Sequence, residues 1–432
     1  MTDLLTDIDF EHLQSRAALA GYDSAVLARS HVLLVGAGAL GQNAAQNLAL
    51  SGVAHLAIVD FDHFEPHNAT RSPFYPGSDS IAGSQSLAKA PHVARELRRI
   101  ATAPRFEVRH AVAAIEDVGD APFDWADVIC LAVDSAAARA YVIDRARLLG
   151  RPVVEAGFSG RNLSLGVFLP EPGAACYRCL NPALSGTFSC RAYAAQAEEA
   201  QLVPAIQTGA AALAAFQAEQ VIALLHGERG LAGRRVYLDV RTLESRVAEV
   251  VISTGCAGYH AGHVGAPEMR VAPAIDGSMT VRLALDRLRV ALGECCVRLP
   301  DMIIGRSWCT KCGALAEVNA PASRWERAPT CRSCGGPWPY GGGSAPIAYD
   351  LVSGFGDLDD LPLSALGVGP GTRLIAYPEG WRPVLIAATG GIDDACPITP
   401  QEGEVVEHAD PTPSADLWVR AGQLSEHDRD PW

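Results

Sequence analysis

The sequence predicts an α/β protein built around a Rossmann-like, mostly parallel sheet, and three observations lead to this fold class. The apolar run 32–35 ends in a glycine-rich turn and is followed by an alanine-rich helical pattern. A second apolar run, 55–59, then closes on Asp60. This order of strand, glycine turn, helix and strand is that of the nucleotide-binding βαβ unit. Further apolar runs alternate with helical patterns as far as residue 170, as in a parallel sheet covered by helices.

The glycine turn has the spacing G-x-G-x-x-G, with Gly36, Gly38 and Gly41 at the three fixed positions. In this motif the first glycine allows the tight turn, the second lets the backbone approach a phosphate, and the third lets the helix lie close to the strand. Asp60 follows roughly 20 residues later, where a carboxylate meets a ribose hydroxyl. The motif therefore predicts a nucleotide site, but it does not decide which nucleotide or which reaction.

The rest of the chain predicts an antiparallel extension of the sheet and a second, different region. Residues 235–240 and 246–252 are typical of a hairpin, whereas the sequence after residue 266 contains a helical pattern and a cysteine-rich unit. We expect four parts: an N-terminal arm at 1–30, the main domain with a structural zinc at 31–265, a helix plus zinc ribbon at 266–345, and a small strand-rich region with an acidic tail at 346–432.

Composition excludes several classes of function. The net charge of -14 argues against nonspecific binding of nucleic acid or of an anionic membrane. The N-terminus carries acids where a signal peptide needs basic residues, and the most apolar helical pattern, 204–225, is interrupted by Gln217 and Glu219. We therefore expect no export and no membrane span. Three Cys-x2-Cys pairs in such a chain predict metal binding rather than disulfides, and a cytoplasmic location.

Several polar residues follow the predicted strands. Asp62, Asn68 and Arg71 come soon after Asp60, and Lys89 begins a later helical segment. Asp134 directly follows the strand pattern 127–133, so it shares with the glycine turn and Asp60 the edge where open α/β sheets bind ligands. Arg71 and Lys89 can neutralise a polyphosphate, and Asp134 can hold Mg²⁺ through oxygen.

Other interpretations remain open for these residues. A lone arginine or lysine is usually a solvated surface charge, and Asp134 could simply cap the helix after it. A nicotinamide (NAD) oxidoreductase would explain the glycines and Asp60 equally well. Hydride transfer, however, has no need for the Asp, Asn, Arg, Lys and Asp series, whereas about four negative charges of a nucleoside triphosphate require neutralisation.

Over residues 16–265 the sequence resembles the ThiF-type, ubiquitin-activating-enzyme-like adenylyltransferases. The shared pattern is the glycine loop, D-x-D followed by N-x-x-R, the later lysine, the aspartate after the fourth strand, and Cys-x2-Cys with a zinc-binding partner downstream. The resemblance implies that the site binds ATP and Mg²⁺. The residues that match the family's nucleotide site are Asp60 for the ribose, Asp62 beside it, Asn68, Arg71 and Lys89 for the phosphates, and Asp134 for Mg²⁺.

The resemblance also implies a homodimer in which Arg16 reaches into the partner's site. The expected reaction is attack of the C-terminal glycine carboxylate of a ubiquitin-like protein on the α-phosphate of ATP, giving an acyl-adenylate and pyrophosphate. Cys190 would then accept the acyl group as a thioester for a conjugating enzyme. The alternatives are a sulfur-carrier protein, a peptide or a small-molecule carboxylate as substrate, an incidental role for Cys190, and a catalytically silent scaffold. Ser72, where relatives have glutamine, and a longer segment after Cys190 depart from the family pattern.

The cysteines divide into two groups. Cys176, Cys179 and Cys256 match the family's zinc site, whose fourth cysteine is replaced here by Tyr259, so that His260, or else His263, would complete a Cys3His set. The second group has the spacing of a zinc ribbon and consists of Cys309, Cys312, Cys331 and Cys334. Four cysteine ligands leave no open coordination position, so this second zinc would be structural or would support partner docking.

Overall fold

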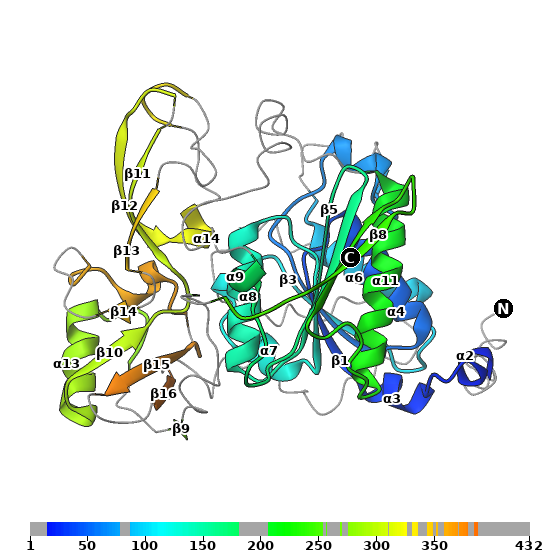
Figure 1. The fold of residues 1–432 in the computed structure, drawn as a ribbon, viewed down its shortest axis with the longest axis horizontal. Coiled ribbons are helices and arrows are strands. Elements are labelled where there is room, and N and C mark those ends of the chain that lie inside the picture. The colour runs from blue at the N-terminus through cyan, green and yellow to red at the C-terminus, as the bar shows by residue number, and fades with distance from the viewer. Residues whose placement is uncertain are drawn as a thin grey trace.

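A central eight-stranded sheet organises the protein, in the strand order β3-β2-β1-β4-β5-β6-β7-β8 (Figure 1). The computed structural model describes residues 15–77, 87–180, 206–253, 256, 268–269, 275–309, 311–325, 331–335, 344–348, 351–352, 358–369, 371–378 and 384–387. The first five strands pair in parallel: β1 (His31–Val35), β2 (His55–Val59), β3 (Glu107–Ala111), β4 (Val128–Leu131) and β5 (Val153–Ser159). The last three extend the sheet in antiparallel fashion: β6 (Asn162–Phe168), β7 (Arg234–Asp239) and β8 (Ser245–Glu249).

Helices cover both faces of the parallel part. One face carries α4 (Ala39–Ser51), α6 (Lys89–Ile100) and α11 (Gln207–Leu225), and the other carries α7 (Ala121–Trp125), α8 (Ala136–Leu148) and α9 (Tyr177–Leu180). Because successive strand side chains point to opposite faces, Val32 and Leu34 join the first core and Leu33 joins the second. Burial on both sides explains why strands β1, β2 and β4 are almost continuous apolar runs in the sequence. The short elements α2 (Ser15–Leu19), α3 (Ser24–Arg29), η1 (Pro66–Thr70) and η2 (Ile115–Asp117) complete this part.

Helix α11 is, among the described residues, the one helix with the length and apolarity to cross a membrane. It packs against α4 and against strands β4, β5 and β6. Gln217, which is fully buried, donates hydrogen bonds to the carbonyl groups of Leu131 and Val154. In this structure the polar residue that interrupts the apolar pattern thus ties the helix to the sheet.

The C-terminal region forms two further sheets. A five-stranded sheet has the order β14-β10-β15-β16-β9, and a three-stranded sheet has the order β12-β11-β13. The strands are β9 (Glu268–Met269), β10 (Cys295–Arg298), β11 (Ile303–Trp308), β12 (Leu315–Pro321), β13 (Ser344–Ala348), β14 (Leu351–Val352), β15 (Arg373–Pro378) and β16 (Val384–Ala387), with the helices α13 (Val281–Leu292), α14 (Ala322–Trp325) and η4 (Leu363–Leu366). Because β10 pairs with both β14 and β15, a single sheet spans the boundary predicted at residue 345.

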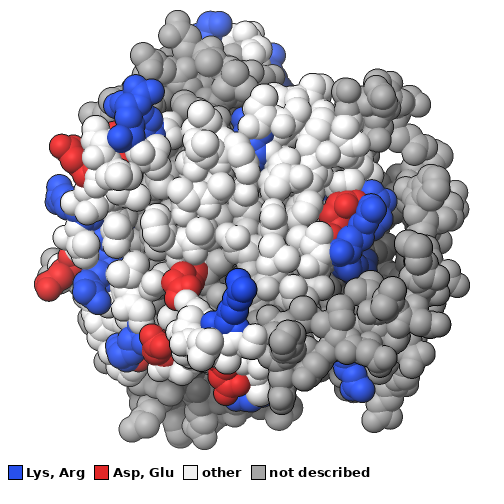
Figure 2. Space-filling model, turned by 90° about the vertical axis from the view of Figure 1, so that its right-hand side faces the viewer, with Lys and Arg blue, Asp and Glu red and all other residues white. Residues whose placement is uncertain are grey.

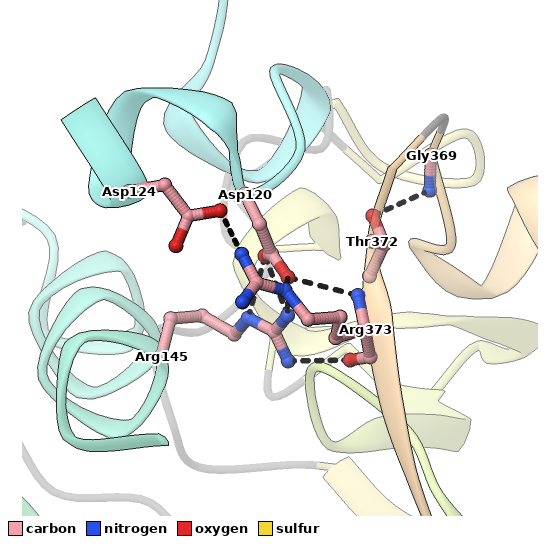
Figure 3. A network of polar contacts seen from close by, with 6 residues as sticks. All are labelled: Asp120, Asp124, Arg145, Gly369, Thr372 and Arg373. Atoms are coloured by element: carbon pink, nitrogen blue, oxygen red, sulfur yellow. Dashed lines mark hydrogen bonds and ion pairs between the residues drawn. The ribbon is translucent and has the colours of Figure 1, made fainter. Parts of the chain in front are cut away.

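A buried ion-pair network fastens the five-stranded sheet to the central unit (Figure 3). Asp120, before α7, accepts hydrogen bonds from the guanidinium group of Arg145 on α8 and, at 2.8 Å, from the backbone N–H of Arg373 at the start of β15. Arg145 in turn donates to the carbonyl oxygen of Arg373 at 2.9 Å. Beside this network, Arg324 of α14 pairs with Asp117 at 2.7 Å. The two parts of the chain are therefore joined through specific polar contacts.

Candidate nucleotide site and cysteine clusters

The glycine loop forms a tight turn between β1 and α4. Gly36 has a φ of 94°, and a Cβ atom there would lie 2.7 Å from the carbonyl oxygen of Ala132. A Cβ atom at Gly41, in the first turn of α4, would lie 1.9 Å from the carbonyl oxygen of Gly36, so this position has no room for a side chain. Gly38 is the N-cap of α4 and would meet nothing within 4 Å. It leaves open space at a helix N-terminus whose N–H groups point outward, which suits a phosphate.

Asp60 holds the loop in place from the end of β2. Its two carboxylate oxygens accept the backbone N–H of Ala37 at 2.5 Å and that of Asp62 at 2.7 Å. Burial raises the pKa of Asp60 to about 6, against the opposing influence of the nearby Lys89 ammonium group. At neutral pH the group is therefore mostly ionised, and it accepts hydrogen bonds at the edge of the loop.

Lys89, one of the two cations predicted for the phosphates, lies beside Asp62, just beyond the end of β2. The Lys89 ammonium group lies 2.9 Å from the Asp62 carboxylate, and the Lys89 N–H donates to the Asp62 carbonyl group at 2.9 Å. Asn68 is buried in η1, where its side-chain oxygen accepts the Glu65 N–H at 2.9 Å. Arg71 ends this helix and is half-buried. Asn68 therefore fixes the turn that presents Arg71.

Asp134 lies just beyond β4, the strand beside β1, and its side chain is exposed. The next residue, Ser135, caps α8 by accepting the Ala138 N–H at 3.1 Å. The helix cap that could have explained Asp134 is thus supplied by Ser135. Because β1, β2 and β4 run parallel, the glycine loop, Asp60 and Asp134 all lie at one edge of the sheet, as the sequence predicted.

The sequence did not single out a buried charge network behind Asp134. Arg139 donates to the carbonyl oxygen of Val133 at 2.7 Å and lies 3.3 Å from the Glu155 carboxylate. Glu155 is fully buried and also pairs with Arg235 at 2.6 Å. Arg139 thereby fixes the residue that precedes Asp134. The sequence offered one indication of this network. Glu155 lies inside an apolar strand, and a charge buried there needs a partner of opposite charge.

Four of the residues predicted for these sites are not placed there by the described structure. Arg16 is exposed in α2, a short helix at the N-terminal side of the molecule. Cys190 and the histidines His260 and His263 lie outside the described residues. Their predicted roles, reaching into a partner, accepting an acyl group and binding zinc, remain predictions.

Both predicted cysteine groups come together in space. The sulfur atom of Cys176 lies 3.8 Å from that of Cys179 and 3.6 Å from that of Cys256. A tetrahedral zinc with Zn–S bonds of about 2.3 Å separates its sulfur ligands by about 3.8 Å, so the three thiols fit one metal ion. The second group also assembles, through Cys309, Cys312, Cys331 and Cys334.

Comparisons with known proteins agree with this arrangement. The model of the ThiF family matches residues 13–256. The chain is 33% identical over 156 residues to the adenylyltransferase and sulfurtransferase UBA4 of Eremothecium gossypii, which covers 36% of this chain and 34% of that protein. It is 34% identical over 155 residues to human ubiquitin-like modifier-activating enzyme 7, covering 34% of this chain and 15% of that protein. The matches thus span about a third or less of these relatives' length.

Among solved structures, Escherichia coli MccB is similar with a TM-score of 0.49 and 20% sequence identity, covering 59% of this chain and 74% of that one. The family match includes the central sheet, the nucleotide-type site and Cys176, Cys179 and Cys256, and it extends over more than half of the sequence. The chain is therefore a member of the ThiF family.

Proposed function

We propose that this protein is a Mg²⁺-dependent adenylyltransferase that uses ATP to activate the C-terminal glycine of a ubiquitin-like protein. The observation that carries the proposal is the convergence of the glycine loop, Asp60, the Asp62–Lys89 pair and Asp134 at one edge of the sheet, in a chain of the ThiF family. Cations, an open helix N-terminus and an exposed carboxylate together provide what a triphosphate and its metal need.

In the proposed reaction the protein mainly positions the reactants and neutralises charge. Asp60 would accept the ribose hydroxyls, while Arg71 and Lys89 would bind the phosphates. Asp134 would hold Mg²⁺, which offsets negative charge on the triphosphate when bound. The substrate carboxylate attacks the α-phosphorus atom, the bond to the β-phosphate oxygen breaks, and pyrophosphate leaves. Proximity and fixed electrostatics are the sources of rate enhancement in this scheme.

The second proposed step transfers the acyl group to Cys190. The Cys190 thiolate attacks the carbonyl carbon of the acyl-adenylate, a thioester forms, and AMP leaves. We assign zinc to Cys176, Cys179 and Cys256, with His260 as the proposed fourth ligand. We also propose a cytoplasmic location, because these thiols must stay reduced and the cytosol keeps thiols reduced.

We further propose a homodimer in which Arg16 completes the partner's site. Figure 2 views the molecule from the side of α4 and α11, where uncharged side chains fill the middle of the face and the charged ones lie mainly towards its margins. Phe216 of α11 and the hairpin residues Leu243 and Val247 are all at least half exposed. With Leu213 and Leu231, the first two line an apolar cleft of about 340 Å³ between α11 and strands β6 to β8. Burial against a second copy would remove this apolar surface from water.

The direct test is ATP–pyrophosphate exchange with ubiquitin-like proteins encoded near this chain's gene. We expect exchange only when the cognate protein is present, and its loss in Arg71→Ala and Asp134→Ala. Arg99→Ala, which removes a mostly exposed arginine of α6, is the matched control and should leave exchange intact. Undiminished exchange in Arg71→Ala and Asp134→Ala would reject the site assignment. Bound NAD in the purified protein would reject the ATP assignment.

A second candidate substrate is a sulfur-carrier protein, which the similarity to the adenylyltransferase and sulfurtransferase UBA4 favours. Both substrates share the adenylation step, so the distinction lies in the product. A reducible thioester trapped on the wild type and absent from Cys190→Ala supports conjugation. A thiocarboxylate at the carrier's C-terminus supports sulfur transfer.

A further inference from the structure

A second group of cysteines that come together in space lies outside the part of the chain that matches the ThiF family. Cys309 and Cys312 follow β11, and Cys331 and Cys334 lie in a separate segment that, in its described residues 331–335, belongs to no helix or strand. All four sulfur atoms lie within 4.8 Å of one another. The match to the ThiF family ends at residue 256, so membership of the family does not explain this group of cysteines.

The sulfur geometry fits a metal ion and not a pair of disulfides. The sulfur atoms of Cys309 and Cys334 are 3.6 Å apart, and those of Cys312 and Cys331 are 3.8 Å apart. A disulfide would bring two sulfur atoms to about 2.05 Å. The edges of a tetrahedron around zinc, with Zn–S bonds of about 2.3 Å, are about 3.8 Å long. The two measured separations are therefore close to the zinc value.

The backbone around the first cysteine of each pair forms the same small turn twice. The Gly313 N–H donates to the Cys309 carbonyl group at 2.7 Å, and the Gly335 N–H donates to the Cys331 carbonyl group at 2.8 Å. Both glycines are left-handed, with φ of 72° and 65°. These paired turns explain why glycine directly follows the second cysteine of each pair, because a residue with a Cβ atom would be strained there.

We propose that Cys309, Cys312, Cys331 and Cys334 bind one structural zinc ion that fastens the segment 331–335 to the β11–β12 hairpin. Zinc is favoured over ferrous iron at a tetrahedral thiolate site by the general order of metal affinities. This hairpin stands away from the rest of the molecule in Figure 1, and α14 at its base is held by Arg324 and Asp117. The metal thus closes the outer end of an arm whose inner end is docked on the central unit.

Elemental analysis of the full-length protein tests the proposal. The expected wild-type content is two zinc ions per chain, one for this site and one for the Cys176 site. Cys312→Ser should lose one equivalent, whereas Cys296→Ser, a cysteine of β10 outside the group, should lose none. An unchanged zinc content in Cys312→Ser, or iron in place of zinc, would overturn the proposal.

A second measurement covers the case in which Cys312→Ser does not fold. Mass spectrometry of the wild-type protein, digested without reductant, should find all four cysteines as free thiols. Limited trypsin digestion should cut after Lys311 or Arg332 only once a chelator has removed zinc. Disulfides among the four cysteines, or cleavage there with zinc still bound, would contradict the proposal. Neither result depends on adenylation, so the proposed function can fail while this site stands.

Discussion

Replacement of Asp120 by asparagine should loosen the C-terminal sheet from the central unit. The Asp120 side chain is 1% exposed and neutralises Arg145, which is 5% exposed, while accepting the N–H of Arg373. Asparagine keeps the size and one acceptor oxygen but removes the charge. Arg145 would then be left as a buried cation without its counter-charge, which typically costs about 3–5 kcal/mol.

That free energy corresponds to an increase of about 10²–10⁴-fold in the equilibrium constant for opening the interface. Native-state hydrogen exchange of the β15 amides measures this opening directly, and it does not require the whole chain to unfold in one step. Asp124→Asn is the matched control, because Asp124 pairs with the same Arg373 but is 47% exposed. Its expected effect is about 0–1 kcal/mol. Equal loss of β15 protection in the two variants would refute the reasoning.

Three further predictions concern the nucleotide loop and the buried charges. Burial raises the pKa of Asp60 to about 6, so protonation of Asp60 below that pH should weaken ribose binding. The KM for ATP in pyrophosphate exchange should therefore rise as pH falls from 7 to 5. The Asp60→Asn variant should show no such rise. Gly41→Ala, whose Cβ atom would lie 1.9 Å from the Gly36 carbonyl oxygen, should lower thermal stability clearly. Gly38→Ala, which meets nothing within 4 Å, should leave stability nearly unchanged but weaken ATP binding in calorimetry; the reverse pattern would contradict the loop assignment. Glu155→Gln should lower the free energy of unfolding by about 3–5 kcal/mol in urea titrations, because two buried arginines lose their shared counter-charge, and a loss below about 1 kcal/mol would argue against it.

Local patterns were sufficient to predict the central sheet. Strands β1, β2 and β4 are buried on both faces, so each is an almost continuous apolar run, and the glycine loop marks the start of the first crossover helix. The two cysteine groups could also be predicted from the sequence, because the two cysteines of a Cys-x2-Cys pair lie close together in the folded chain. Asp60 and Asp134 were placed correctly at one edge because parallel topology fixes where strands end.

Contacts between residues distant in sequence were not predictable in this way. Strand β10 pairs with β15 although more than 70 residues separate them in the sequence, and no local periodicity in the sequence indicates that pairing. Asp120 meets Arg373 although 253 positions separate them. Glu155 and Arg235 neutralise each other from two strands of the sheet. Such pairs depend on the tertiary arrangement, and a single sequence offers only the hint that a charge in an apolar run needs a partner.

The pairing of β10 with β14 means that the arm carrying the second cysteine group is inserted between two adjacent strands of one sheet. Arg298, where β10 ends, lies directly opposite Leu351, where β14 begins, in an antiparallel register. The chain therefore leaves this sheet at Arg298 and re-enters it at Leu351, beside the point where it left. A two-residue Asn-Gly turn is the natural connection between adjacent antiparallel strands, so it could join 298 to 351 without altering the sheet. A chain shortened in this way would show whether the central unit folds without the arm.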